Sequence, residues 1–127
     1  MSFESNRSIT LTPVAANVIN QNRFINIVTA GEVDESTAAG DAVGVSLEAS
    51  AAASGVTIPV SLLDGAKMEV ELGATVAAGA RIMSDATGRA ITATGATARV
   101  LGITLTGGDI NEIATIVGLK AAGEFVA

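Results

Sequence analysis

The 127-residue chain contains no histidine and no cysteine. Without cysteine, disulfide bonds and thiolate chemistry are excluded. Without histidine, the chain lacks the commonest general base and the commonest ligand for zinc or iron, and its serines cannot form a Ser-His-Asp triad. Nucleotide-binding motifs of the P-loop and dinucleotide type are also missing. The sequence therefore predicts that the protein is not an enzyme and holds neither a metal nor a cofactor.

Tryptophan and tyrosine are absent too, and aromatic residues make up only 2% of a chain that is 49% hydrophobic. The core must then consist of Val, Ile, Leu and Ala, with Phe24 and Phe125 as its largest candidates. Burial contributes about 25 cal/mol per Å² of apolar surface, and alanine offers little area per residue. A small core of this kind gains stability when the folded protein binds a partner.

Basic residues are scarce: seven Lys and Arg stand against thirteen Asp and Glu, which gives a net charge of −6. Because binding to a phosphate backbone needs a row of cations, we expect no nucleic-acid partner. No apolar stretch approaches the roughly 18 residues of a membrane helix, so we expect no membrane association. The first residues show no signal-peptide pattern, which indicates synthesis in a cytoplasm without export.

Strand patterns dominate what is present. Lys67–Leu72 alternates apolar and charged residues with a period of two, as a strand with one wet face does. Two further strands flank a turn at Ser84–Arg89, where Asp85 and Gly88 suit the turn backbone. Short β-branched runs separated by Gly, Ser, Asp and Thr continue along the chain, at Arg23–Thr29, Ala42–Ala49, Gly55–Leu62, Ala80–Met83, Ala90–Thr94, Ala98–Thr104 and Glu112–Leu119. This spacing predicts an all-β fold, a small barrel or sandwich.

The chain also contains one short sequence motif twice. VGVSL begins at Val43, LGITL begins at Leu101, and each phrase is followed by a later Thr-Ile pair at the same offset of 58. We interpret this as a possible internal duplication of a β-hairpin unit, although Val/Gly/Thr-rich strands resemble one another in any case. The apolar core of the repeat is expected to comprise Val43, Val45, Leu47, Ile58, Leu101, Ile103, Leu105 and Ile116.

The first 26 residues differ from the rest in having a poor periodicity, and the sequence indicates no partner strand for them. We therefore divide the chain into an extended N-terminal arm (residues 1–26) and a β-rich domain (27–127). An arm of this kind can dock on another chain by strand addition and pocket filling. An ordinary first strand of the barrel is the alternative. The candidate contact residues of the arm are Arg7, Ile9, Leu11, Val14, Val18, Ile19 and Arg23.

Three Gly/Ala/Val-rich segments then carry a resemblance. They are Ala39–Ala49, Gly73–Ala90 and Arg99–Leu105. In this order they resemble the "G-V-A-L" phrase, the Gly-Asp-Gly hairpin and the closing "v-l-G-v-a" phrase of the capsid cement (decoration) proteins of tailed bacteriophages. The resemblance extends from about residue 30 to the end of the chain.

The resemblance implies a structural virion protein without catalytic residues. Cement proteins of this kind are small, β-rich and often trimeric. They sit on the outer capsid surface at local three-fold positions and bridge neighbouring subunits of the shell. The implied partners are the major capsid protein and further copies of this chain in a homotrimer. Repetition around a three-fold axis would strengthen weak contacts through effective concentration.

Two other functions stay open on the sequence. The stretch around Lys67 and the later GATVAAGARI are similar to parts of biotinyl and lipoyl carrier domains, which would make the chain a carrier or accessory domain of an enzyme complex. Against this, Lys67 falls within a strand alternation and not at a hairpin tip, and Gly73 follows too soon. The chain could also be another β-rich virion part, such as the base of a head fibre.

Overall fold

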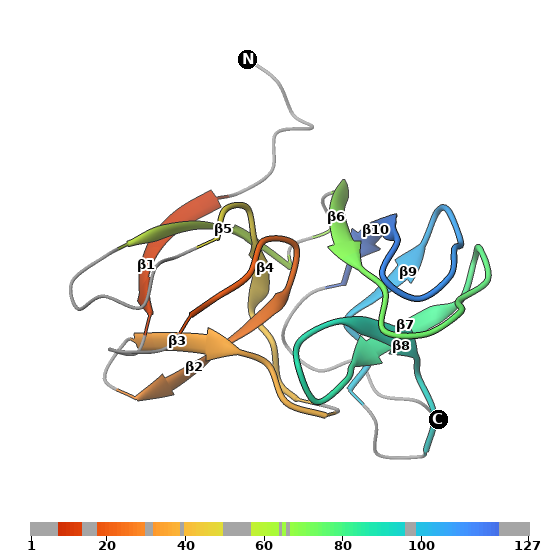
Figure 1. Ribbon diagram of the computed structural model, residues 1–127, viewed down its shortest axis with the longest axis horizontal. Helices are drawn as coiled ribbons and strands as arrows, with labels where there is room; N and C mark the ends of the chain where they lie inside the picture. The colour runs from red at the N-terminus through yellow and green to blue at the C-terminus, as the bar shows by residue number, and fades with distance from the viewer. Residues whose placement is uncertain are drawn as a thin grey trace.

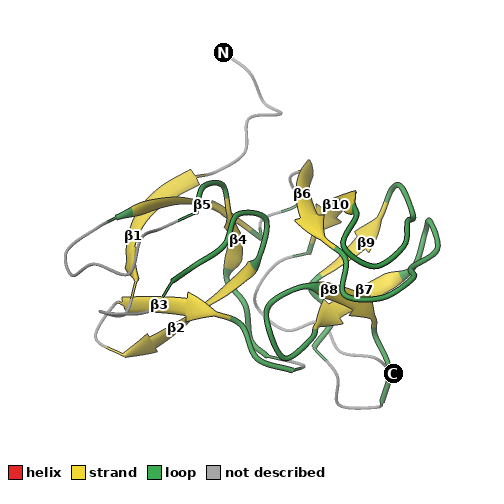
Figure 2. Ribbon diagram, viewed as in Figure 1, coloured by secondary structure: helices red, strands yellow, loops and turns green. Residues whose placement is uncertain are grey.

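The computed structural model is all-β, and no helix occurs in the part of the chain that it describes (Figure 2). The described residues form ten strands in two sheets, which lie side by side as two lobes (Figure 1). The all-β prediction is thus confirmed. The described residues are 8–13, 18–29, 32–38, 40–49, 57–63, 65, 67–95 and 99–119.

The first lobe is a small closed barrel with the strand order β1-β3-β2-β4-β5. It closes because β1 pairs antiparallel with β5 and, over its last two residues, parallel with β3. The other neighbours in the ring are antiparallel. The strands are β1 (Ser8–Pro13), β2 (Phe24–Thr29), β3 (Glu32–Glu35), β4 (Gly44–Ser46) and β5 (Ile58–Leu62).

The second lobe is a five-stranded sheet with the order β6-β10-β9-β7-β8, and all these neighbours are antiparallel. A single parallel bridge from Leu72 to Ala90 joins its two edges, so that this sheet also curls toward a barrel. The strands are β6 (Lys67–Glu71), β7 (Arg81–Ser84), β8 (Ala90–Thr92), β9 (Gly102–Thr104) and β10 (Ile113–Gly118).

The two lobes are copies of one unit. Each strand of the first lobe has a counterpart five strands later, and each pairing recurs: β1–β5 as β6–β10, β2–β3 as β7–β8, β2–β4 as β7–β9, and β4–β5 as β9–β10. Even the parallel pair Pro13–Val33 has its counterpart in the bridge Leu72–Ala90. The duplication expected from the repeated phrase therefore extends to five strands, where a hairpin was expected.

Hydrogen bonds repeat at the level of single atoms. In the first lobe the Ser46 hydroxyl accepts from the Arg23 amide (3.1 Å) and donates to the Asn20 carbonyl (2.5 Å). In the second lobe the Thr104 hydroxyl accepts from the Ala80 amide (3.0 Å) and donates to the Ala77 carbonyl (2.7 Å). Chance similarity between Val/Gly/Thr-rich strands does not reproduce such a network, so the internal duplication is structural.

The predicted offset of 58 residues between equivalent positions holds for β4 and β9, but it does not hold for β5 and β10. Gly44 and Gly102 are equivalent, because a Cβ on either would collide with the facing carbonyl oxygen of Ser61 or Val117. Glycine is required where two backbones approach so closely. In β5 and β10, however, Gly44 faces Leu62 whereas Gly102 faces Gly118, which shifts the offset to 56.

Each lobe has its own apolar core. The five buried residues of the first core are Ile19, Ile25, Val33, Ile58 and Val60. The larger cluster fills the second lobe and includes Met68, Val70, Leu101 and Ile116. It also takes in side chains from the first lobe: Phe24, Ala42, Val45 and Leu63.

The expected repeat core is confirmed in half of its members. Val45, Ile58, Leu101 and Ile116 are buried, and Val43, Leu47 and Ile103 are half-buried. The prediction that Leu105 belongs to the core is wrong, because 49% of this residue is exposed. It follows β9 on the outward side of the strand, where period-two alternation places it opposite the barrel interior.

The prediction of an extended N-terminal arm is wrong over Ser8–Pro13, because β1 pairs with β5 of its own lobe. The alternative, an ordinary first strand, describes these residues, and the proposed boundary after residue 26 falls inside β2. Ile9–Thr12 does alternate, and the partner β5 lies about fifty residues further along the chain. Because of that separation, no local sequence pattern indicates the pairing. Arg7 and Val14 lie outside the described residues.

A buried serine provides a first test of the core. Ser61 is fully buried, and its hydroxyl has no hydrogen-bond partner among the described residues. Its counterpart in the second lobe, at the offset of 56, is Val117. Replacing Ser61 by alanine should raise the free energy of unfolding by about 1 kcal/mol, because an unsatisfied buried hydroxyl costs about 1–3 kcal/mol. Urea denaturation measures the change.

Ser46 is the matched control for this substitution. It is equally buried, but its hydroxyl bonds to the backbone of Asn20 and Arg23. Ser46→Ala should therefore lower stability by about 1–2 kcal/mol. Equal losses in both variants would show that the Ser61 hydroxyl has a partner in solution.

Candidate interaction surface

The junction between the lobes is the most elaborate site in the described structure. Its apolar part consists of Phe24, Ala42, Val45 and Leu63, which are at most 3% exposed and belong to the core cluster of the second lobe. Phe24 is the largest fully buried side chain among the described residues. Its amide donates to the carbonyl of Gly88, at 2.7 Å, on the β7–β8 turn of the second lobe.

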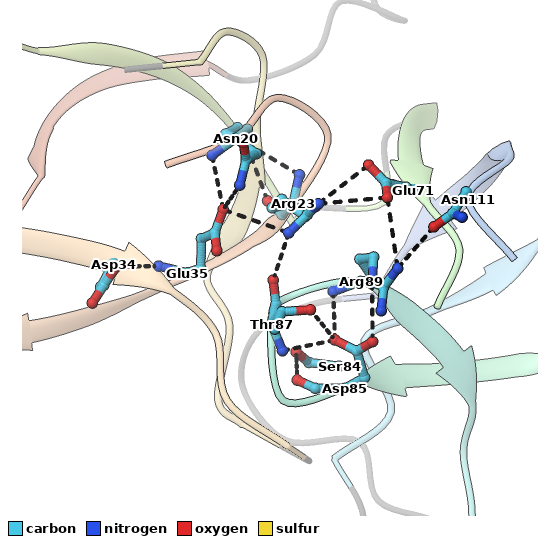
Figure 3. A network of polar contacts seen from close by, with 11 residues as sticks. Asn20, Arg23, Asp34, Glu35, Glu71, Ser84, Asp85, Thr87, Arg89 and Asn111 are labelled. Atoms are coloured by element: carbon cyan, nitrogen blue, oxygen red, sulfur yellow. Dashed lines mark hydrogen bonds and ion pairs between the residues drawn. The ribbon is translucent and has the colours of Figure 1, made fainter. Parts of the chain in front are cut away.

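A network of polar contacts also joins the two lobes (Figure 3). Arg23 extends from the first lobe, and its Nη2 lies 3.4 Å from Oε1 of Glu71 in β6. Its Nη1 donates to the carbonyl of Thr87 (3.1 Å) and lies 3.7 Å from Oε2 of Glu35. Glu35 in turn accepts from the side-chain amide of Asn20 (2.9 Å). One guanidinium thereby ties the loop before β2 to two elements of the other lobe.

A second arginine continues the network inside the second lobe. Nη1 of Arg89 donates to Oδ1 of Asn111 (2.9 Å) and lies 3.9 Å from Oε2 of Glu71. Its Nε lies 3.3 Å from Oδ2 of Asp85. Since these side chains are 14–24% exposed, solvent weakens each ion pair, and their main effect is to fix the geometry of the junction.

Asp85 holds the β7–β8 turn in shape. Burial alone would raise the pKa of its carboxyl group. The backbone amides of Thr87 and Arg89 donate to Oδ1 at 2.8 and 2.9 Å, the Thr87 hydroxyl adds a third bond, and the Arg89 charge lies nearby. Together these groups outweigh burial and lower the pKa of Asp85 below its usual 3.8.

The lowered pKa makes stability depend on pH in a defined direction. A carboxylate whose pKa is lower in the folded state stabilises the protein above its unfolded pKa, and this stabilisation is lost as pH falls through the folded value. Thermal midpoints measured from pH 6 down to about 2 should therefore fall more steeply below pH 4 for the wild type than for Asp85→Asn. Parallel curves for the two proteins would contradict this assignment.

An open groove of about 430 Å³ runs beside the junction, between the loop before β2 and the edge of β6. Among the described residues, Lys67 and Glu69 are the charged members of its lining. Acid–base catalysis needs two titratable groups in contrasting environments, and this groove supplies no such pair. The lining residues are Gln21, Asn22, Leu47, Lys67, Met68, Glu69 and Thr115.

Lys67 itself lies at the start of β6, paired with Val117, and it is exposed. The prediction that it occupies a strand and not the tip of a hairpin is confirmed. Over the described ranges, no helix could cross a membrane and no group of carboxylates is arranged to hold a metal ion.

The predicted contact residues of the arm have different surroundings in the structure. Ile19 is buried in the first core, and Arg23 is half-buried in the junction network. Ile9 and Leu11 are part of β1. Val18 is 50% exposed. Of Val18, Ile19 and Arg23, it is the one whose side chain is open to a partner.

Five more large hydrophobic residues are exposed in the described chain, and none of the five was predicted to lie at the surface. They are Ile27, Val28, Leu105, Ile110 and Ile113. Leu105 was expected in the core, and the others stood within or beside expected strands. The period-two pattern gives alternation along a strand, but it does not show which face a second lobe covers.

The fold and its junction place the chain in the class of small, internally duplicated β-barrel proteins. The family model of the phage cement proteins matches residues 3–118, and the chain belongs to this family. It is thus a structural, virion-associated protein of a bacteriophage, as the resemblance implied.

A solved structure shares the fold. It is the crystal structure of the head fiber gp8.5 N base in bacteriophage phi29, with a TM-score of 0.70 and 15% sequence identity. The match covers 93% of this chain and 98% of the other. No curated protein matches the sequence.

Proposed function

We propose that the protein is a capsid decoration subunit that binds the outer surface of the shell at local three-fold positions and bridges neighbouring capsid subunits. It acts as a homotrimer, its partner is the major capsid protein, and it performs no reaction. Membership in the cement family is the observation that carries this proposal.

The exposed surface supports a binding role. The large hydrophobic residues exposed in the described chain are distributed over both lobes, and the net charge of −6 keeps the free subunit soluble. Repetition of such weak contacts around a three-fold axis multiplies their strength without requiring a large interface per subunit. Val18 is the arm residue that we retain as a candidate capsid contact.

Expanded empty capsids that lack the protein provide the test. The purified protein should bind them to saturation and raise the temperature at which they disrupt. Cryo-microscopy of the decorated shell should show density at the local three-fold positions. Absence of binding to the cognate expanded shell would refute the proposal.

The base of a head fibre is a second candidate, favoured by the shared fold with the phi29 fiber base. The same cryo-microscopy distinguishes the two. A fibre base would carry a projecting extension above the shell, whereas a decoration subunit would end at the two-lobed density. Both functions place the protein on the capsid surface.

A further inference from the structure

Strand β6 has an open edge that faces the first lobe. It is the first strand in the order of the second sheet, and β10 pairs with one of its two sides (Figure 1). On the other side, the amide of Glu71 donates to the Asn22 carbonyl of the first lobe, at 2.9 Å. Backbone groups alternate between the two sides of an antiparallel strand. Lys67 and Glu69 therefore direct their N–H and C=O groups away from β10, as Glu71 does.

A groove lies along this edge. The open space of about 430 Å³ is lined by three successive residues of β6, Lys67–Glu69, and by Gln21, Asn22 and Leu47 of the first lobe. The bond between Glu71 and Asn22 is a first rung between β6 and a neighbouring main chain. Among the described residues, no strand continues these rungs along the groove. The outward backbone groups of Lys67 and Glu69 are thus accessible to another extended chain.

The side chains at this edge specify the chemistry of such a chain. Lys67 and Glu69 are exposed and share one face of β6, and the buried Met68 between them points to the other face. Cross-strand pairing favours an acidic residue opposite Lys67 and a basic residue opposite Glu69. The residue between these two would face the side of Met68, where the half-buried Leu47 adds apolar surface to the groove. The edge therefore fits a segment in which one acidic and one basic residue flank an apolar one.

We propose that an extended segment of the major capsid protein with this pattern adds to the edge of β6 as a further strand. The inference rests on the proposed function, in which the capsid protein is the partner, and it assigns the contact to one strand. Strand addition gains its affinity from main-chain hydrogen bonds and its specificity from alternate side chains. It thus suits a groove whose lining is mostly polar, and it continues a main-chain contact that already joins the two lobes.

Glu69→Pro is the sharpest substitution, because proline removes the outward N–H. Proline is tolerated on edge strands where the N–H faces solvent, so the variant should fold. Its affinity for expanded empty capsids should fall about tenfold or more, since one main-chain bond is lost and the facing carbonyl is left unpaired. Circular dichroism and thermal unfolding check the fold, and co-sedimentation with capsids measures the affinity.

Thr10→Pro is the matched control in the first lobe. Thr10 stands three positions before Pro13, as Glu69 stands three positions before Leu72, and the bridges of Pro13 and Leu72 are equivalent. Thr10 is exposed, and its partner in β5 is Pro59, whose carbonyl accepts from another strand. It is not part of the groove lining. This variant should bind capsids as the wild type does.

Hydrogen exchange of the wild type tests the same edge without a substitution. In the free protein, the amides of Lys67 and Glu69 should exchange faster than those of Met68 and Val70, which face β10. Binding to expanded empty capsids should slow the exchange of Lys67 and Glu69. Mass spectrometry of the capsid-bound protein measures this protection even if Glu69→Pro does not fold.

The outcomes separate this inference from the proposed function. A wild type that does not bind capsids would refute both. Capsid binding that is unchanged in Glu69→Pro, or that leaves the exchange of Lys67 and Glu69 unaltered, would overturn the inference alone. Slow exchange of these two amides in the free protein would also overturn it, because the edge would then be filled by this chain or by a second copy.

Discussion

Gly88→Ala is expected to lower the free energy of unfolding by about 3 kcal/mol, which corresponds to a fall of roughly 10 °C in the midpoint of thermal unfolding for a chain of this size. Two effects add up. Gly88 has a φ of +82°, which costs an L-residue about 1–2 kcal/mol. Its new Cβ would also lie 2.8 Å from the carbonyl oxygen of Phe24, within the junction of the lobes.

Gly79→Ala separates the two effects. Gly79 has a φ of +79°, but a Cβ there would meet nothing within 4 Å. This variant should lose only the backbone cost, about 1 kcal/mol. Gly79→Asn should lose less still, because asparagine tolerates this backbone region and Asn22, with a φ of +61°, occupies the equivalent position in the first lobe. Equal losses for Gly88→Ala and Gly79→Ala would show that the lobes move apart to accept the methyl group.

The strands that the sequence predicts best are those whose pattern is local. β6 alternates apolar and charged residues, and its bounds agree with the structure within one residue. The turn at Ser84–Arg89 likewise depends on adjacent residues, and its Asp85–Thr87 bond is present. β3 was missed because Glu32–Glu35 has only Val33 as an apolar member, so its acidic composition hides it from a search for hydrophobic periodicity.

Long-range pairing is what the sequence did not predict. The repeated phrase identified β4 and β9 as equivalent, but the two-residue shift between β5 and β10 shows only in the register. The position of β1 depends on β5 and β3, which are distant in the chain, so the segment looked like a free arm. The junction could not be predicted at all, because no sequence pattern around Phe24 indicates that its side chain packs in the core of the other lobe.

Phe24→Ala should lower the free energy of unfolding by about 3–5 kcal/mol, the usual cost of removing a buried phenyl ring. Phe24 is at the start of β2 in the first lobe, yet its side chain packs in the cluster that fills the second lobe. The cavity should therefore weaken the second lobe as much as the first. Amide hydrogen exchange should rise in β6–β10 as well as in β2, and urea denaturation should give the total loss.

Ile25→Ala is the control, because Ile25 is the next residue of the same strand and is equally buried. Its side chain belongs to the core of the first lobe, and removing it should cost about 2–5 kcal/mol. Faster exchange should then be concentrated in β1–β5. The two variants have similar total losses but differ in where the structure opens, which follows from period-two alternation at a strand between two cores. Unchanged exchange in β6–β10 of Phe24→Ala would mean that the second lobe is stable without the phenyl ring, and that the junction does not couple the two copies.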